Sequence, residues 1–474
     1  MNVPWYELVS LIPLIGALLL WRPMETGKAR FICILLAGIT LILAIGLELL
    51  AVPVNTTWIG LLFHQDLVHI DEFSRPLLPL TALIYFSTLL ATVGHKAKNF
   101  SFSGALLGES LTLLTFSTDV LWLMVVLQCL SVIPIWFELR SRGRSTRVYT
   151  IHQVLFVFCL VLGGWLHTPN SVPSMSLSVS LLTIAVLIRS GAFPFHVWRI
   201  DLFEKATFGS AILFVSPMMG AYICLRWVLP SEPDWALHAI SILSLATAVY
   251  AASMALVQND GRRFYCYLFL SHASLVLVGL ELATPIGIAG ALSMWVSVGV
   301  ALTSFGITMR CIEARIGRID LGNYYGLYNH MPTMAAFFLL TGLASVGFPC
   351  TIGFVAGELL TESVIAYSPW IGCLVVLATT LNGIAVMRAY FRVFTGTKHV
   401  TSIPMRSQPE EMFAIIAMTL IILGGGLYPQ PGVESRYRAA VHLLENYQRI
   451  PHPSGHADPQ AQHSIPADRS ASEL

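Results

Sequence analysis

Long apolar segments recur along the whole of this chain, and they constrain its fold more than any other feature. A helix needs about 17 to 25 mostly apolar residues to cross a bilayer, and by that rule the chain has about fourteen candidates. They are 5–21, 31–52, 75–94, 101–118, 120–137, 149–167, 174–191, 206–229, 234–256, 263–283, 285–309, 332–366, 369–391 and 411–429. Only 11% of the 474 residues are charged, which is too few for a water-soluble surface. The sequence therefore predicts an all-α polytopic membrane protein.

The distribution of lysine and arginine supports this segmentation. If successive segments alternate in direction, one side of the membrane receives 20 of the 27 cationic residues. The loops on that side are 22–30, 95–100, 138–148, 192–205, 258–263, 310–331 and 388–410. Because cytoplasmic loops are enriched in Lys and Arg, we expect a multi-pass protein of the inner (cytoplasmic) membrane with both termini on the non-cytoplasmic side. The polar tail 430–474 then lies outside, and we expect its end, 451–474, to be disordered.

Several classes of function lack support in the sequence. A net charge of +1 and the absence of a basic-aromatic stripe argue against nucleic acid. The eight cysteines are scattered without a CxxC pair, and no phosphate-binding loop, nucleotide fingerprint or HExxH is present. The N-terminus, MNVPWYE, has neither the basic region nor the cleavage site of a removed signal. We expect no catalytic residue, metal site or bound cofactor in this chain, so any redox chemistry must take place in a partner.

Two prolines interrupt apolar segments. Pro194 in AFPFH and Pro349 in GFPCT remove backbone donors where a helix would otherwise continue. Non-helical backbone within the membrane is tolerated only where it is buried inside the protein or lines a water-filled cavity. Paired broken helices in the two halves of a chain therefore indicate a transport site in inverted-repeat transporters. The alternative is that both prolines occupy loops just outside the bilayer.

Ionisable residues in membrane spans are functional candidates, since each costs about 2.5–3.5 kcal/mol to insert. Glu48 and Glu281 stand near segment ends, where they can reach the interface. Glu109 lies in mid-segment, and the alternative to a proton-path role is a hydrogen bond to a neighbouring Ser or Thr. Arg189 ends an apolar stretch and stays charged, so it can fix a carboxylate or act as an anchor that reaches the cytoplasmic surface.

Two histidines and an acid complete the candidates for a proton path. His196 and His272 can exchange protons near neutral pH, although a single membrane histidine is more often a packing group. Ser271 and Ser274 flank His272 at positions suited to a water chain. Glu358 follows the second proline break, where a buried carboxylate can be tuned to hold and release a proton.

Four stretches together resemble the antiporter-like membrane subunits of respiratory complex I and the related cation antiporters. They are HIDEFSRPLLPLTALI (69–84), GAFPFHVWRIDLFEKATFGSAILF (191–214), FYCYLFLSHASLVLVGL (264–280) and MPTMAAFFLLTGLASVGFPCTIGFVAGELL (331–360). The chain looks most like the subunit M (chain 4) type. That resemblance implies fourteen helices and two inverted five-helix repeats, in a complex that uses NADH and quinone and has other membrane subunits as partners.

The resemblance also implies a division of the chain. Its parts are 1–100 with helices 1–3, 101–229 as the first repeat, 230–400 as the second repeat, 401–429 as the last helix, and the tail 430–474. The two repeats hold helices 4–8 and 9–13.

The chain departs from this family at the residues expected to move protons. Arg189 stands in the place of a lysine, and Gln128 or Cys129 stands in the place of the glutamate that pairs with it. The segment 210–222 has no ionisable residue where a lysine or histidine is expected, and Val298 replaces another histidine; Glu358 retains the terminal acid. A Gln–Arg pair cannot load and unload a proton, because one member never ionises and the other never neutralises.

The sequence therefore supports a proton-translocating subunit of a complex I-like NADH-quinone oxidoreductase, divergent and with pumping in doubt. Its proton path would combine Glu109, Gln128, Arg189, His196, His272 and Glu358. Two alternatives remain: the membrane subunit of a two-component ion or inorganic-carbon uptake system, and a scaffold subunit with a dead channel.

Overall fold

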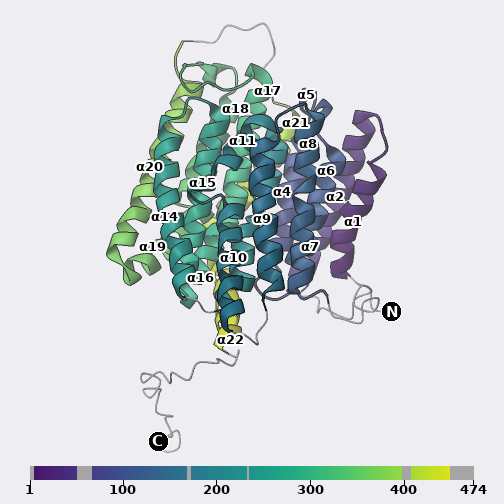
Figure 1. Cartoon of the computed structure of the whole chain (residues 1–474). Coiled ribbons are helices and arrows are strands. Elements are labelled where there is room, and N and C mark those ends of the chain that lie inside the picture. Colours follow the sequence, from purple (N-terminus) through teal and green to yellow (C-terminus); the bar gives the residue numbers. More distant parts are fainter. Residues whose placement is uncertain (1–4, 51–66, 168–171, 232–233, 398–406, 449–474) are drawn as a thin grey trace, which may run out of the picture.

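The computed structural model describes residues 5–50, 67–167, 172–231, 234–397 and 407–448. Within these ranges every regular element is a helix, apart from an isolated antiparallel bridge between Asp260 and Asp320. The helices stand side by side in an upright bundle (Figure 1). An apolar segment in lipid must satisfy its backbone hydrogen bonds internally, which a helix does. The predicted all-α class is confirmed.

The helices follow the apolar segments of the sequence. The first half contains α1 (Trp5–Leu19), α2 (Thr26–Leu49), α4 (Leu77–Leu90), α5 (His95–Lys98), α6 (Phe102–Phe116), α7 (Leu121–Ser131), α8 (Ile133–Ser141), α9 (Arg147–Trp165), α10 (Val172–Ser190), α11 (Val197–Lys205), α12 (Phe208–Val215), α13 (Met219–Ile223), the π-helix η1 (Cys224–Val228) and the 3₁₀ turn η2 (Leu229–Ser231). The second half contains α14 (Asp234–Val257), α15 (Gly261–Glu281), α16 (Pro285–Ser297), the π-helix η3 (Val298–Leu302), α17 (Thr303–Ile316), the 3₁₀ turn η4 (Leu327–Asn329), α18 (Pro332–Val346), α19 (Ile352–Tyr367), α20 (Pro369–Phe394), α21 (Pro409–Leu427) and α22 (Gln430–Gln448).

Among the described residues, nine helices are long and apolar enough to cross a membrane. Some of them combine consecutive elements, such as α7 with α8 and α16 with η3 and α17. The segments at 208–231, 261–281 and 285–316 are almost wholly buried and form the centre of the bundle, whereas α2 and α20 present much of their apolar surface outward. Lipid covers such outward apolar surface, so the bundle needs no polar outer face.

Both proline segments interrupt helices. α10 ends at Ser190, Gly191 adopts φ 63°, and Pro194 follows before α11 begins. α18 ends at Val346, Gly347 adopts φ 95°, and α19 starts after Pro349. A positive φ is readily available to glycine, which is why each helix stops at one.

The segment 208–231 contains an interruption that the sequence analysis did not anticipate. α12 and α13 are separated by Ser216–Met218, with Met218 at φ 51°, and the π-helix η1 follows. A second π-helix, η3, lies within the 285–316 segment. π-Helical turns inside α-helices are often found at functional sites.

The predicted polar tail 430–474 begins with a helix. Residues 430–448 form α22, which packs against α16 and buries Ala439 and Ala440. Figure 1 shows α22 at the lower end of the bundle. The expected disorder of 451–474 lies outside the described residues.

Candidate functional site

Arg189 lies inside the bundle at the end of α10. Only 5% of the residue is exposed, and its guanidinium packs over Phe214 at 4.2 Å and Phe156 at 5.5 Å from the ring centroids. Nη2 donates a hydrogen bond to Ser131 Oγ at 3.3 Å, while Nη1 has no hydrogen-bond partner. The alternative of an anchor that reaches the membrane surface is therefore wrong. Arg189 is a fixed positive charge in a buried, aromatic setting.

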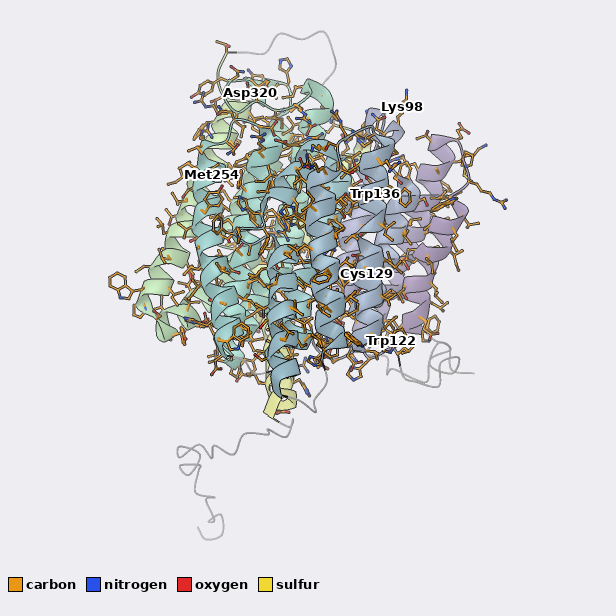
Figure 2. All side chains as sticks on the ribbon, viewed as in Figure 1. Lys98, Trp122, Cys129, Trp136, Met254 and Asp320 are labelled. Carbon is orange, nitrogen blue, oxygen red and sulfur yellow. The ribbon has the colours of Figure 1, made fainter. Side chains whose placement is uncertain are left out.

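No carboxylate among the described residues forms an ion pair with Arg189. The side chain of Gln128 is buried and donates a hydrogen bond to Thr115 Oγ1 at 3.4 Å, and Cys129 is only half-buried on the neighbouring face of α7. Figure 2 places Cys129 at mid-height of the bundle. Ser131, one turn along the helix, takes the position next to the guanidinium instead. Ser131 was not among the predicted site residues, because a lone serine in an apolar segment is most often a packing residue.

Glu109 is fully buried in α6. Neither of its carboxyl oxygens has a hydrogen-bond partner, which rules out the predicted alternative of a bond to a neighbouring Ser or Thr. Its electrostatic neighbours are Cys33 of α2 and Tyr85 of α4. Tyr85 also interacts electrostatically with Arg189.

The two histidines occupy different environments. His272 is buried in α15, where its Nδ1 is 2.8 Å from the Leu268 carbonyl oxygen. Ser271 donates to the Ala248 carbonyl and accepts from Asn382 Nδ2, so it is held by protein groups. His196 precedes α11, and its ring packs against Phe193 and Tyr250. His272 is a central candidate, whereas His196 belongs to an aromatic cluster.

Glu358 does not lie in the interior, and this corrects the prediction of a buried carboxylate. α19 buries Ala356, Leu360 and Val364, and the helical period of 3.6 residues turns Glu358 to the outer, exposed face. Glu362, one turn further, is also exposed. The structure therefore does not bring Glu358 together with the buried His272.

The two acids near segment ends have cationic neighbours. Glu281 Oε1 is 2.5 Å from His238 Nδ1, an interaction that ties α15 to α14. Glu48 interacts electrostatically with Arg436 of α22. Both acids therefore have partners at the ends of helices, as expected for residues near the interface.

One end of the bundle carries most of its cations and is called here the cation-rich end; it is defined by Lys96, Lys98, Arg142, Arg144, Arg262, Arg310 and Arg315. Figure 2 shows Lys98 at this upper end and Trp122 at the opposite end. Glu411 accepts hydrogen bonds from Lys96 Nζ at 2.6 Å and Arg315 Nη2 at 2.5 Å, and Arg262 pairs with Glu313. These ion pairs join α5, α15, α17 and α21 at the cation-rich end of the bundle.

An interior cavity with about 40 Å³ of space for water lies between α4, α6, α8 and α12. Its lining includes Ser131 and Phe214, which contact Arg189, together with Tyr85 and Glu138. Glu138 was not among the predicted site residues, because residues 138–148 were expected to form a loop.

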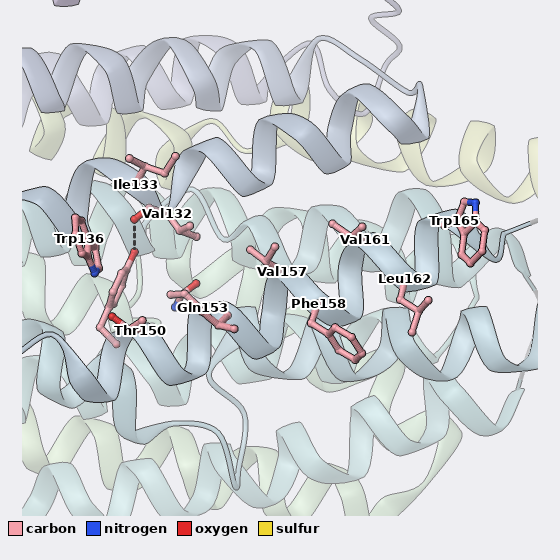
Figure 3. Close-up of a pocket in the computed structure, with 12 residues that line it drawn as sticks. Val132, Ile133, Trp136, Thr150, Gln153, Val157, Phe158, Val161, Leu162 and Trp165 are labelled. Carbon is pink, nitrogen blue, oxygen red and sulfur yellow. Dashed lines mark hydrogen bonds between the residues drawn. The ribbon is translucent and has the colours of Figure 1, made fainter.

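A separate apolar groove runs along the outer face between α7–α8 and α9. Figure 3 shows it bounded by Trp136 and Trp165, with a hydrogen bond from Tyr149 Oη to the Val132 carbonyl at 2.9 Å. The groove has a volume of about 610 Å³ and is lined almost entirely by apolar atoms. It suits an aliphatic chain or an apolar helix and holds none of the predicted site residues.

Broken apolar helices around single buried ionisable groups define a polytopic membrane protein of the ion-transporting class. The chain belongs to the transmembrane family described as NADH:quinone oxidoreductase/Mrp antiporter, which matches residues 145–382. The resemblance stated from the four sequence motifs is thereby confirmed.

Similar curated proteins carry related names. NADH-quinone oxidoreductase subunit M of Rickettsia prowazekii (strain Madrid E) is 26% identical over 422 residues, covering 82% of this chain and 85% of that protein. The chloroplastic NAD(P)H-quinone oxidoreductase chain 4 of Chlorokybus atmophyticus is 24% identical over 513 residues, covering 95% of this chain and 98% of that protein.

Solved structures share the fold. A chain of respiratory complex I from Thermus thermophilus with bound NADH superposes with a TM-score of 0.79 at 21% identity, covering 93% of this chain and 99% of that one. A chain of the Mrp complex from Dietzia sp. DQ12-45-1b superposes with a TM-score of 0.78 at 15% identity, covering 94% of this chain and 98% of that one.

Proposed function

We propose that this chain is a proton-translocating, antiporter-like membrane subunit of a complex I-like NADH-quinone oxidoreductase, in which other subunits bind NADH and react with quinone. The observation that carries the proposal is the burial of two ionisable side chains, Arg189 and Glu109, without an ion pair between them. Arg189 also contacts Ser131 and Phe214, which line a cavity of water size. Burying two ionisable groups without a direct ion pair is unfavourable for a purely structural element, so the arrangement indicates a role in moving charge.

The proposed architecture has fourteen spans and two inverted five-helix repeats, 101–229 and 230–400. The helix breaks at Pro194 and Pro349 support it, since corresponding breaks in two halves are typical of such repeats. The gathering of cations at one end supports an orientation with that end in the cytoplasm. The chain would then lie in the inner membrane with both termini on the opposite side.

The proposed mechanism uses Arg189 as a permanent charge. Arginine does not release its proton at ordinary pH, so its field acts on neighbouring groups instead of exchanging protons itself. The groups able to take and release protons are Glu109 and His272. The absence of the family's glutamate at Gln128 or Cys129, and of its histidine at Val298, makes the path divergent from that of the family.

The test is proton translocation by the complete complex in sealed vesicles, followed with a pH-sensitive dye at matched protein levels. We expect Arg189→Gln and Glu109→Gln to lower translocation while the complex remains assembled. Arg140→Gln, at an exposed arginine on α8, is the matched control and should behave as wild type. Wild-type translocation in Arg189→Gln, Glu109→Gln and His272→Gln alike would reject the proposal in favour of a non-conducting scaffold.

A further inference from the structure

Glu138 connects a surface hollow at the cation-rich end with the interior cavity. The hollow has a volume of about 440 Å³, and its lining includes Ser101, Glu138, Ser141 and Arg142. Ser101 and Glu138 also line the interior cavity. Glu138 is 7% exposed and therefore stands at the boundary between solvent and the interior.

The local structure keeps the Glu138 carboxylate in place. Glu138 Oε1 accepts a hydrogen bond from the Thr207 backbone N–H at 2.8 Å, and Thr207 is the N-cap of α12. The N-terminus of a helix carries a partial positive charge, which favours an ionised carboxylate. The electrostatic interaction with Arg310 of α17 acts in the same direction. These interactions fix the position of the Glu138 carboxyl group between the hollow and the cavity.

The cavity offers a route from Glu138 to the interior. About 10–15 Å³ of such space is the minimum for one water molecule, so about 40 Å³ has room for at least one. Hydroxyl groups of Tyr85, Ser131 and Ser210 line it and can hydrogen-bond those molecules. Gly108 keeps the passage open beside Tyr85, because a Cβ there would lie 3.0 Å from the tyrosine hydroxyl.

We propose that Glu138 is the proton-loading group at the entrance of this path, taking the place of the acid absent at positions 128 and 129. Its carboxylate accepts a proton from solvent at the cation-rich end, becomes a carboxylic acid, and returns to a carboxylate when it passes that proton to cavity water. The positive charge of Arg189 at the inner end raises the free energy of a proton that approaches it, so the outer end is the favoured resting position.

The inference rests on the proposed proton-translocating function, and its test separates the two. In vesicles containing the complete complex, we expect Glu138→Gln to lower proton translocation at least about tenfold, because removing a positioned proton-transfer group typically costs about 10²-fold or more. Glu138→Asp should restore part of the rate and shift its pH profile. Glu204→Gln is the matched control: Glu204 pairs with Arg263 near the same end and lines neither cavity.

A second measurement uses the unmodified complex. Dicyclohexylcarbodiimide reacts with carboxyl groups that have taken up a proton, so mass spectrometry should find more of it on Glu138 in a complex that is turning over than in a resting one. Wild-type translocation in Glu138→Gln with impaired Arg189→Gln, or absence of the carbodiimide from Glu138, would overturn the assignment while leaving the proposed function intact. Wild-type translocation in both variants and in Glu109→Gln and His272→Gln would overturn both.

Discussion

Arg226 and Asp71 form a two-point ion pair, with Nη1–Oδ2 at 2.7 Å and Nη2–Oδ1 at 2.8 Å. The pair joins the turn that precedes α4 to the π-helix η1, which follows 155 residues later in the chain. Arg226 also packs over Phe73 and Tyr222. The parallel donors of a guanidinium match a carboxylate, so this contact sets the geometry between the two segments.

Asp71→Asn should destabilise the protein by about 3 kcal/mol, because it leaves a mostly buried arginine without its anion. The measurement is thermal unfolding of the detergent-solubilised protein, followed by tryptophan fluorescence. Glu25→Gln is the control, since the Glu25–Lys28 pair is exposed and contributes little. Equal unfolding temperatures for Asp71→Asn and wild type would show that the Asp71–Arg226 pair does not stabilise the fold.

The same pair predicts a dependence of stability on pH. Burial would raise the pKa of Asp71, but the charge and hydrogen bonds of Arg226, with bonds from Ser74, lower it to about 2. A lowered carboxyl pKa gives stability that is fully present above the unfolded value near 4 and is lost as pH falls toward 2. The difference in stability between wild type and Asp71→Asn should therefore shrink across that window. A constant difference from pH about 5 to about 2 would contradict the assignment.

The close approach of α19 to the end of α18 depends on Gly353. A Cβ at this position would lie 2.1 Å from the Ala344 carbonyl oxygen, which belongs to the backbone and cannot turn aside. We expect Gly353→Ala to destabilise the protein by about 1–3 kcal/mol through overpacking. Gly357→Ala on the same helix meets nothing within 4 Å and should be neutral or slightly stabilising. Similar unfolding temperatures for the two variants would show that α19 does not approach the Ala344 carbonyl oxygen of α18 this closely.

Glu109 and Glu358 should respond differently to substitution. Glu109 is buried without a hydrogen-bond partner, so Glu109→Leu should raise stability by about 1–3 kcal/mol while it impairs translocation. Glu358 is exposed on α19, so Glu358→Gln should leave the unfolding temperature of the isolated chain unchanged. A destabilised Glu109→Leu variant would indicate that the acid is a structural contact.

The proposed orientation predicts which side of the membrane reaches Arg144. In a variant without the exposed Cys350 and Cys373, Arg144→Cys should react with an impermeant thiol reagent only from the cytoplasmic side. Trp122→Cys, at the opposite end of the bundle in Figure 2, should react only from the other side. Labelling of Arg144→Cys from the outside alone would reverse the proposed topology.

The sequence by itself determined the fold class and the positions of the helices. Apolar segments of bilayer length must become helices, because lipid offers no hydrogen-bond partner to a free backbone group. The helix breaks at Pro194 and Pro349 could also be predicted from the sequence, since proline lacks the backbone N–H donor that a continuing helix needs. The interruption at Ser216–Met218 carries the same signal in Pro217, but the hydropathy of 206–229 was interpreted as one continuous segment.

The tertiary structure decided which ionisable residues can act together. Hydropathy gives no rotation about a helix axis, so it could not tell that Glu358 faces outward while Glu109 faces inward without a partner. It also could not show that Ser131 meets Arg189, 58 residues away, or that Glu138 enters the cavity beside Tyr85. Such contacts depend on the packing of helices distant in the sequence, and this packing is set by the shapes of side chains on several helices at once.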